Sequence, residues 1–462
     1  MTKQKKANIA MGFFLTACIL PAAGMIFLPP EPAAANQTLA APPALFQPDE
    51  SFNTRVLNDT ADYVADHLGF RQELITAHAV MNAAVFHVSS EDSVLLGKNG
   101  WLFYQETLDD YLHTKPLSQR QLFAAAHTLS LLSEYSAAQG ARLYFTVAPN
   151  KASLYPEQLP NVGQPLEGES NLERLVPLLE AEGVNYVDLF TPLDEQEEYL
   201  YYKTDSHWTD QGAALAHDTL IAAMDKKDQT AFFDGPTQPG PPHLGDLFEM
   251  LYPSLNQPED TKVYQRPFSF SYVRQPRSPE DQRIETECAD RSGNLLMFRD
   301  SFGNTLHSYM ADAFGSALFS RSMPYQMSLL SETGADTVLI EIVERNLEWL
   351  TERAPVFPAP QRQFAQVPAP GGGDASITVQ ESGQLPGYLC LEGWLSAAPD
   401  ENSPIYVRLA DRVYEASPTG SWEDGTPFTL YVEQSAYAQT ACVLYFENGT
   451  LCSSDSTTIQ EG

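Results

Sequence analysis

Basic residues are scarce in this chain of 462 residues, which has 27 Lys and Arg against 60 Asp and Glu and a formal net charge of −33. A surface this acidic repels the phosphate backbone of a nucleic acid, so we expect no nucleic-acid partner. The charge fits a protein that stays soluble outside the cell, and it carries no information about the fold.

Cysteines are also few, and none of the five stands in a CxxC motif or pairs with a histidine at the spacing of a zinc site. We therefore expect no structural zinc, and we predict no other metal and no cofactor. In an oxidising compartment, disulfide bonds are permitted but not required among the four cysteines that follow the N-terminal segment. These are Cys288, Cys390, Cys442 and Cys452.

The composition also lacks the bias of a disordered, collagen-like or polytopic membrane protein, since 43% of the residues are hydrophobic and 11% are aromatic. The length allows two or three globular domains of about 150 residues each. A sizeable hydrophobic core therefore needs no stapling by metals or disulfides.

The N-terminus has the pattern of an export signal. Lys3, Lys5 and Lys6 precede an uncharged, mostly apolar stretch over residues 7–30, and the first acidic residue is Glu31. Charge followed by an apolar run is typical of a segment that directs a chain across a membrane. We therefore predict an extracytoplasmic location for the rest of the chain.

Residues 1–30 are either a cleaved signal peptide or a retained membrane anchor. The small residues at 33–35 form a candidate cleavage site. The apolar run is close to the roughly 20 residues that span a bilayer, and this length and the interrupting Pro21 favour an anchor. In that case the basic residues stay inside and the remaining chain lies outside.

Residues 51–353 form the predicted catalytic domain, preceded by a Pro- and Ala-rich tether at 31–50. Residues 51–90 have helical spacing, and the chain then alternates between helical and extended patterns. This alternation predicts an α/β fold with a mainly parallel sheet covered on both faces. The pattern is helical at 117–140, 172–182, 210–224 and 304–314, and extended at 142–148, 184–190, 294–298 and 336–343.

A Pro-rich insertion at about 226–291 interrupts the alternation. It is too long for an ordinary connection between a helix and a strand, so we expect it to form a lid or a wall over a site.

The C-terminal part has a different sequence pattern from the predicted catalytic domain. Residues 354–375 contain several prolines and three consecutive glycines and are interpreted as a linker. Residues 376–462 show short β-type runs and Asn448-Gly449 as a hairpin turn, which predicts a small β-sandwich-like domain. Five large aromatic residues in this region serve either as sugar-stacking faces or as core. They are Trp394, Tyr406, Tyr414, Trp422 and Tyr431.

Ser301 follows an apolar strand and precedes a helix in the segment 295–304. A hydroxyl at this place lies at the carboxyl end of a strand and near a helix N-terminus, where backbone N–H groups stabilise an oxyanion. The alternative is that Asp300 or Ser301 simply caps the helix.

Asp205 and His207 complete a candidate catalytic set. A serine hydroxyl needs a base to take its proton, and a carboxylate must hold the imidazole in one tautomer. Two-residue spacing in a loop allows Asp205 to take that place. The alternatives are a structural histidine beside a buried Trp208, and an Asp205 that caps the helix beginning at Asp210.

Together, five segments resemble the alginate O-acetyltransferase-like branch of the SGNH hydrolases, which includes the DHHW proteins. The resemblance covers about residues 52–350 and implies a three-layer α/β/α domain. In that branch the Asp-x-His pair precedes the serine, a circular permutation of the usual order. Transfer to this chain makes Ser301 the nucleophile, His207 the base and Asp205 its orienting acid. The segments are Gly100-Trp101-Leu102-Phe103, Pro149 to Pro156, Thr204 to Thr209, Arg299 to Gly303 and Val343 to Asn346.

Two positions depart from the family pattern. Arg299 replaces a glycine, and Ser206 stands where the DHHW name has a second histidine. Arg299 either narrows the site or binds an anionic group of the substrate, with a surface salt bridge as the alternative. Arg345 is expected to pair with Glu341 or Glu344, with a substrate contact as the alternative.

The asparagine that usually helps to bind the oxyanion has no certain counterpart. Asn150 is the candidate, with Lys151 and Tyr155 beside it as substrate-binding residues, and Asn304 is a further candidate next to the serine. Ordinary turn chemistry at Pro149-Asn150 is the alternative.

The resemblance implies a polysaccharide O-acetyltransferase that works through an acetyl-serine intermediate. Export removes the chain from cytosolic acetyl-CoA, so a membrane-bound O-acyltransferase is the implied source of acetyl groups. The polysaccharide is the acceptor. Two alternatives stay open at this point, a carbohydrate acetylesterase with the same triad and a non-catalytic scaffold that binds glycan through its β-domain.

Overall fold

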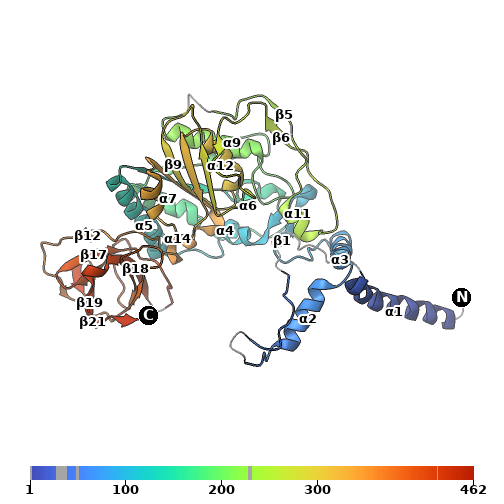
Figure 1. Cartoon of the computed structure of the whole chain (residues 1–462), viewed down its shortest axis with the longest axis horizontal. Helices are drawn as coiled ribbons and strands as arrows, with labels where there is room; N and C mark the ends of the chain where they lie inside the picture. The colour runs from blue at the N-terminus through green and yellow to red at the C-terminus, as the bar shows by residue number, and fades with distance from the viewer. Residues whose placement is uncertain (1–2, 28–38, 48–50, 227–230, 424) are drawn as a thin grey trace.

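The protein, described here by a computed structural model for residues 3–27, 39–47, 51–226, 231–423 and 425–462, is built around a seven-stranded sheet (Figure 1). The strand order is β4-β3-β11-β9-β10-β8-β7. The strands from β4 to β10 are parallel, but β8 is antiparallel to β10 and β7 is antiparallel to β8. The sheet is therefore mixed, and the predicted mainly parallel arrangement holds only as far as β10, because the edge strands come from the insertion. The bounds are β4 Tyr186–Val187, β3 Arg142–Ala148, β11 Thr337–Val343, β9 Asn294–Phe298, β10 Ser316–Ser320, β8 Arg283–Glu287 and β7 Ser271–Tyr272.

Helices cover both faces of this sheet, in three layers. Leu295 and Met297 of β9 pack with α9 (Asp210–Ala223) and α12 (Gly303–Ala311) on one face. Leu296 and Phe298 pack on the other face with α5 (Gln119–Ala138), α7 (Asn171–Ala181) and α13 (Ser328–Thr333). Successive side chains of a strand point to opposite faces, so a fully apolar strand is buried between two helical layers.

The predicted helices and strands are found close to their expected bounds, with one exception. The run at 184–190 contains only the two-residue β4, and its last residue begins α8 (Phe190–Asp194). The carboxylate of Asp188 accepts the backbone N–H of Phe190 at 2.8 Å. This local hydrogen bond from backbone to side chain turns the chain toward a helix before the strand can continue.

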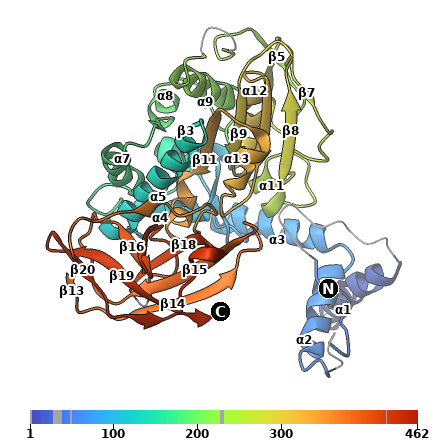
Figure 2. The same cartoon turned by 60° about the vertical axis from the view of Figure 1, so that its left-hand side comes forward.

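The N-terminal part contains α1 (Lys3–Phe27), α2 (Val56–His67) and α3 (Arg71–Phe86), and α1 and α2 project away from the sheet in both views (Figures 1 and 2). Among the described residues, no helix is both long and apolar enough to cross a membrane. The candidate cleavage site at 33–35 lies outside the described residues.

The C-terminal part is a pair of β-sheets around a common apolar core (Figure 2). One sheet has the order β12-β17-β16-β19-β20-β13 with β21 beside β19, and the other has the order β18-β15-β14-β22. The bounds in the first sheet are β12 Gln361–Arg362, β17 Arg412–Ala416, β16 Ile405–Leu409, β19 Thr440–Glu447, β20 Thr450–Ser453, β13 Ala369–Pro370 and β21 Thr457–Thr458. Those in the second are β18 Thr426–Glu433, β15 Tyr388–Leu395, β14 Ala375–Glu381 and β22 Gln460–Glu461.

The segment 354–375 is not a free linker in this structure. It contributes β12 and β13 to the first sheet, and Val356 and Phe357 are buried. Tyr406, Tyr414 and Tyr431 are also buried, so these three aromatic residues belong to the core rather than to a sugar-binding face. The four cysteines beyond the N-terminal segment are free thiols.

A chain of charged groups joins the C-terminal sheets to α5. His127 of α5 lies between Glu182, at 2.8 Å from Nδ1, and Glu415 of β17, at 3.1 Å from Nε2. Arg362 of β12 pairs with Glu415 and with Glu134 of α5. Burial lowers the pKa of His127, but the two carboxylates raise it more, and the net shift is upward.

Candidate active site

Ser301 lies in the short turn between β9 and α12, at the carboxyl end of the strand. Asp300 shapes this turn, because its Oδ1 accepts the N–H of Phe302 at 2.9 Å and its Oδ2 accepts the N–H of Val343 at 2.7 Å. The residue at the helix N-cap is Phe302, and no side chain caps the helix. The capping alternative for Asp300 and Ser301 is therefore wrong, and the Ser301 hydroxyl is available to a neighbour.

That neighbour is His207. Its Nε2 is 2.9 Å from Oγ of Ser301, and its Nδ1 is 2.8 Å from Oδ1 of Asp205. Oδ1 of Asp205 also accepts the backbone N–H of His207 at 2.8 Å. The structure thus brings the three residues together in the order expected for a nucleophile, a base and an orienting acid.

Hydrogen bonds fix the segment that carries Asp205 and His207 to helix α9 and to the serine turn. Thr209 caps α9 by accepting the N–H of Gly212 at 3.2 Å, so Asp205 does not cap that helix. Trp208 is buried, and its Nε1 donates to the carbonyl of Phe302 at 3.2 Å. This hydrogen bond connects the histidine segment directly to the serine turn.

Electrostatics favour an ionised acid beside a basic imidazole. Burial raises the pKa of Asp205, but hydrogen bonds from two histidines lower it more, and the net pKa lies well below the usual range. Burial lowers the pKa of His207, while Asp205 and Asp246 raise it, and the net shift is upward. A raised pKa makes His207 a stronger base toward the serine proton.

The insertion contributes two residues that sequence reasoning missed. Nε2 of His243 lies 2.8 Å from Oδ2 of Asp205, and its ring stacks on Tyr202 with a centroid distance of 4.1 Å. Asp246, the first residue of α11 (Asp246–Leu251), donates its N–H to the same oxygen at 3.1 Å. Oδ2 of Asp246 accepts the hydroxyl of Ser206 at 2.6 Å and lies 3.5 Å from Nδ1 of His207.

Asp205, His207 and Asp246 are also close enough to one another to hold a metal ion. Both oxygens of Asp205 and both ring nitrogens of His207 are, however, already engaged in the hydrogen bonds described above. A cation bound there would have to break the contact between His207 and either Ser301 or Asp205.

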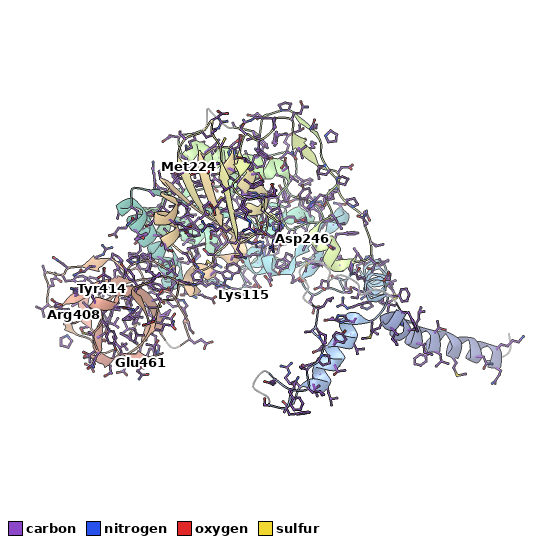
Figure 3. All side chains as sticks on the ribbon, viewed as in Figure 1. Lys115, Met224, Asp246, Arg408, Tyr414 and Glu461 are labelled. Carbon is purple, nitrogen blue, oxygen red and sulfur yellow. The ribbon has the colours of Figure 1, made fainter. Side chains whose placement is uncertain are left out.

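A cavity of about 1010 Å³ opens next to Ser301 and His207. Its walls come from the two catalytic segments and from the insertion. Further residues precede β1 (Val94–Leu96), lie at the end of β2 (Leu102–Tyr104), or follow β10 and β11. Asp246 lies in this part of the molecule, well apart from Arg408, Tyr414 and Glu461 of the C-terminal sheets (Figure 3). The lining residues used below are Glu91, Tyr104, Glu106, Glu249, Glu280, Asn304, Arg321, Arg345 and Trp349.

Lys151, predicted to bind substrate, is not among the residues that line this cavity. It is fully buried, and Nζ donates to the backbone carbonyls of Tyr202, Lys203 and Asp205 at 3.0, 3.1 and 2.6 Å. Burial lowers its pKa to about 7. Lys151 therefore supports the loop that carries Asp205 and His207.

Asn150 and Tyr155 are also structural. Asn150 is buried, and its Nδ2 donates to Oδ2 of Asp110 at 2.9 Å. The hydroxyl of Tyr155 accepts the N–H of Leu200 at 3.0 Å. Neither residue is among those that line the cavity.

Arg299 and Asn304 form a connected pair beside Ser301. Arg299 is buried, donates to Oδ1 of Asn304 at 2.6 Å and to the carbonyl of Pro279 at 2.6 Å, and does not line the cavity. Among the described residues it forms no ion pair, so neither a substrate contact nor a salt bridge describes it. Asn304 does line the cavity.

The sequence predicts an ion pair between Arg345 and Glu341 or Glu344, but Arg345 pairs with neither residue in the structure. Its guanidinium lies over the rings of Tyr104 and Phe302, at 5.4 and 5.7 Å from their centroids, and it lines the cavity. Glu341 is instead buried behind the serine turn and accepts the N–H of Asp300 at 3.2 Å. Burial and the neighbouring Asp300 raise the pKa of Glu341 well above its usual range.

Comparison with known proteins confirms the family resemblance. Residues 94–282 match a sequence model of the SGNH hydrolase-like domain of the acetyltransferase AlgX. This range includes Asp205, His207, His243 and Asp246 and ends before Ser301.

Two curated relatives are both named "Probable alginate O-acetylase AlgJ". The one from Pseudomonas fluorescens is 26% identical over 216 residues, which cover 45% of this chain and 50% of the relative. The one from Pseudomonas syringae pv. tomato is 28% identical over 137 residues, which cover 29% of this chain and 34% of the relative. The chain thus spans about half or less of the length of these relatives.

Among solved structures, the O-acetyltransferase domain of Pseudomonas putida AlgJ is 19% identical and has a TM-score of 0.40, covering 55% of this chain and 92% of that domain. A DHHW family protein from Eubacterium siraeum is 18% identical with a TM-score of 0.38, covering 48% of this chain and 85% of that protein. The fold is SGNH hydrolase-like, with additional β-rich regions.

Proposed function

We propose that this chain is an extracytoplasmic O-acetyltransferase that acetylates hydroxyl groups of a polysaccharide. The observation that carries the proposal is the line of hydrogen bonds from Ser301 through His207 to Asp205, at 2.9 and 2.8 Å, beside an open cavity. The relatives named alginate O-acetylase support acetyl transfer to a polysaccharide.

In the first half of the reaction, Oγ of Ser301 attacks the carbonyl carbon of an acetyl ester or thioester. His207 takes the serine proton at Nε2, and the ionised Asp205 stabilises the imidazolium. His207 then returns the proton to the leaving group, which departs and leaves acetyl-Ser301.

The negative charge that forms on the carbonyl oxygen needs hydrogen-bond donors. The side chain of Asn304 lines the cavity, and its Oδ1 accepts a hydrogen bond from Arg299. This hydrogen bond orients the amide, and Nδ2 is the first donor in this proposal. The backbone N–H of Ser301 at the start of the serine turn is the second donor in this proposal. Two preorganised donors are worth several kcal/mol of the barrier. Arg299 is then a positioning residue.

In the second half, a sugar hydroxyl attacks acetyl-Ser301. His207 accepts the hydroxyl proton and gives it to the departing Oγ, so the acetyl group moves to the sugar and the enzyme is restored. The N-terminal pattern of an export signal supports a location away from cytosolic acetyl-CoA. A membrane-bound O-acyltransferase is therefore the proposed partner that supplies acetyl groups.

His243 is the proposed positioning residue for the acid. Asp205 Oδ1 serves His207, and its Oδ2 is held by His243 and by the N–H of Asp246. With both oxygens fixed, the carboxylate cannot rotate away from the imidazole.

The test is a chromogenic acetate assay with the full chain, with and without an oligosaccharide. We expect acetylated sugar and a serine-directed phosphonate adduct on Ser301. Acetate release that sugar does not change supports an esterase instead. A folded protein without any adduct supports a scaffold.

A further inference from the structure

We propose that the acceptor is a glycan without acidic groups, either uncharged or amine-bearing, and not a polyuronate such as alginate. This inference rests on the proposed function and concerns the same cavity. It differs from what the names of the relatives suggest, and it follows from the charges that an acceptor meets on its way to Ser301.

Acidic side chains outnumber basic ones along the cavity. Glu91, Glu106, Glu249 and Glu280 line it, and Asp205, Asp246 and Asp300 lie among its deeper residues. The basic side chains in the lining are Arg321, Arg345 and the two histidines His207 and His243, which both contact Asp205. Glu106 and Glu280 are exposed, and the other two glutamates are partly buried, so these carboxylates face solvent or acceptor rather than the core.

The two arginines offset this charge only in part. The guanidinium of Arg345 lies over the rings of Tyr104 and Phe302. Arg321 donates to the backbone carbonyl of Glu280 at 3.2 Å. Among the described residues, neither arginine forms an ion pair with a lining carboxylate, so four glutamates face two cations in the outer cavity.

A polyuronate has one carboxylate on every sugar. Several consecutive sugars in this cavity would bring several carboxylates among four glutamates, and like charges in a partly desolvated site repel strongly. The net charge of −33 adds repulsion at long range, most strongly at low ionic strength.

The same walls suit an uncharged or amine-bearing sugar. Tyr104 and Trp349 are partly buried aromatic rings of the lining, and aromatic faces pack against sugar rings whatever their charge. Carboxylates accept hydrogen bonds from hydroxyl groups and pair with ammonium groups. The cavity therefore offers acceptors for the protons of such a sugar.

The test compares three tetrasaccharides as acceptors for the full chain, with 4-nitrophenyl acetate as donor and mass spectrometry of the acetylated product. The acceptors are tetramannuronate, mannotetraose and the fully deacetylated tetramer of chitosan. We expect kcat/KM for the uncharged and amine-bearing acceptors to exceed that for tetramannuronate about tenfold or more in low salt, and the gap to narrow in high salt.

Variants in which glutamine replaces glutamate test whether the cavity causes the preference among acceptors. The triple variant Glu106→Gln, Glu249→Gln and Glu280→Gln is expected to narrow the preference about fivefold or more, mainly by better use of tetramannuronate. The control Glu381→Gln, Glu401→Gln and Glu447→Gln removes the same charge from exposed positions in the C-terminal part and should leave the preference unchanged.

Three outcomes would each overturn a different part of the proposal. Tetramannuronate used as well as or better than the other acceptors in low salt overturns this inference and leaves the transferase function standing. A preference that both triple variants change equally overturns the assignment to the cavity. Ser301-dependent acetate release with no acetylated sugar overturns the transferase function, and this inference with it.

Discussion

Replacing Lys151 by methionine separates a loop-supporting role from a substrate-binding one. The change removes a buried amine that donates to three backbone carbonyls at 3.0, 3.1 and 2.6 Å. A buried acceptor left without a donor costs about 1–3 kcal/mol, so the three carbonyls together cost about 3–9 kcal/mol.

An opposing contribution comes from burial of the charge. Burial lowers the pKa of Lys151 from 10.5 to about 7. At about 1.4 kcal/mol for each pKa unit, this shift corresponds to about 5 kcal/mol against the charged form, which methionine recovers. With the middle of the first range, about 6 kcal/mol, the net loss for Lys151→Met is about 1 kcal/mol, or about 3 °C in Tm.

The pH dependence of this loss has a definite sign. In the unfolded chain lysine keeps its proton up to about pH 10, whereas the folded chain releases it near pH 7. Between these values the unfolded state binds more protons, so the unfolding free energy of the wild type rises with pH. The difference between wild type and Lys151→Met should therefore widen by up to about 1.4 kcal/mol per pH unit above pH 7.

The assay is thermal unfolding at pH 7 and pH 9, together with hydrolysis of a chromogenic acetate. We expect kcat to fall about tenfold with little change in KM, because the loop that carries Asp205 and His207 loses its support. Lys98→Met, at an exposed lysine with a single carbonyl partner at 2.9 Å, is the control and should change stability by less than about 0.5 kcal/mol. A raised KM with an unchanged Tm would refute the reasoning and return Lys151 to substrate binding.

Three further predictions concern the histidines and the serine. Ser301→Ala and His207→Ala should each lower acetate release about 10⁴-fold with little change in Tm, since members of one catalytic unit fail together; a Ser301→Ala protein with a tenth of the wild-type rate would contradict this assignment. His243→Ala should lower kcat and move the acidic limb of the pH profile to higher pH, because Asp205 then raises the pKa of His207 further, and His243→Gln should restore part of the rate; an unchanged pH profile would argue against the positioning role. The raised pKa of His127 makes its ion pairs stabilising below about pH 6.5 and progressively weaker above it. The amount by which the Tm of the wild type exceeds that of His127→Gln should therefore shrink between about pH 6.5 and 8.5, and a constant difference would exclude this contribution.

The three residues of the candidate triad could be predicted because each belongs to a short local pattern. Ser301 follows an apolar strand, and Asp205 and His207 are two residues apart in one loop. The contacts that bring these segments together, from His207 to Ser301 and from Trp208 to Phe302, join residues 94 positions apart. The family resemblance supplied that proximity, which no local pattern contains.

His243 and Asp246 could not be found in this way. They lie 38 and 41 residues beyond Asp205 in a Pro-rich insertion with neither helical nor alternating spacing. A sequence shows that such an insertion exists, but not which of its polar side chains turns inward. The same limit applies to β7 and β8, whose short mixed runs carry no apolar pattern to mark them as edge strands.

The directions in which the side chains of Lys151 and Arg299 point could not be predicted, for a related reason. A charged side chain beside a catalytic motif suggests substrate binding, since buried charges are rare. Whether such a side chain points outward or into the protein depends on backbone carbonyls that no residue letter reveals. Here three carbonyls of one loop receive Lys151, and the carbonyl of Pro279 and the amide oxygen of Asn304 receive Arg299.

The insertion does two jobs that are physically inseparable. Its residues Glu249 and Glu280 line the cavity beside Ser301, while His243 and Asp246 hold the carboxylate of Asp205. Any exchange of this segment between related enzymes, made to change which polysaccharide is modified, therefore also exchanges the support of the proton-transfer machinery. Engineered chimeras should keep His243 and Asp246 in register with Asp205 and vary the glutamates alone, and natural divergence in acceptor choice faces the same restriction.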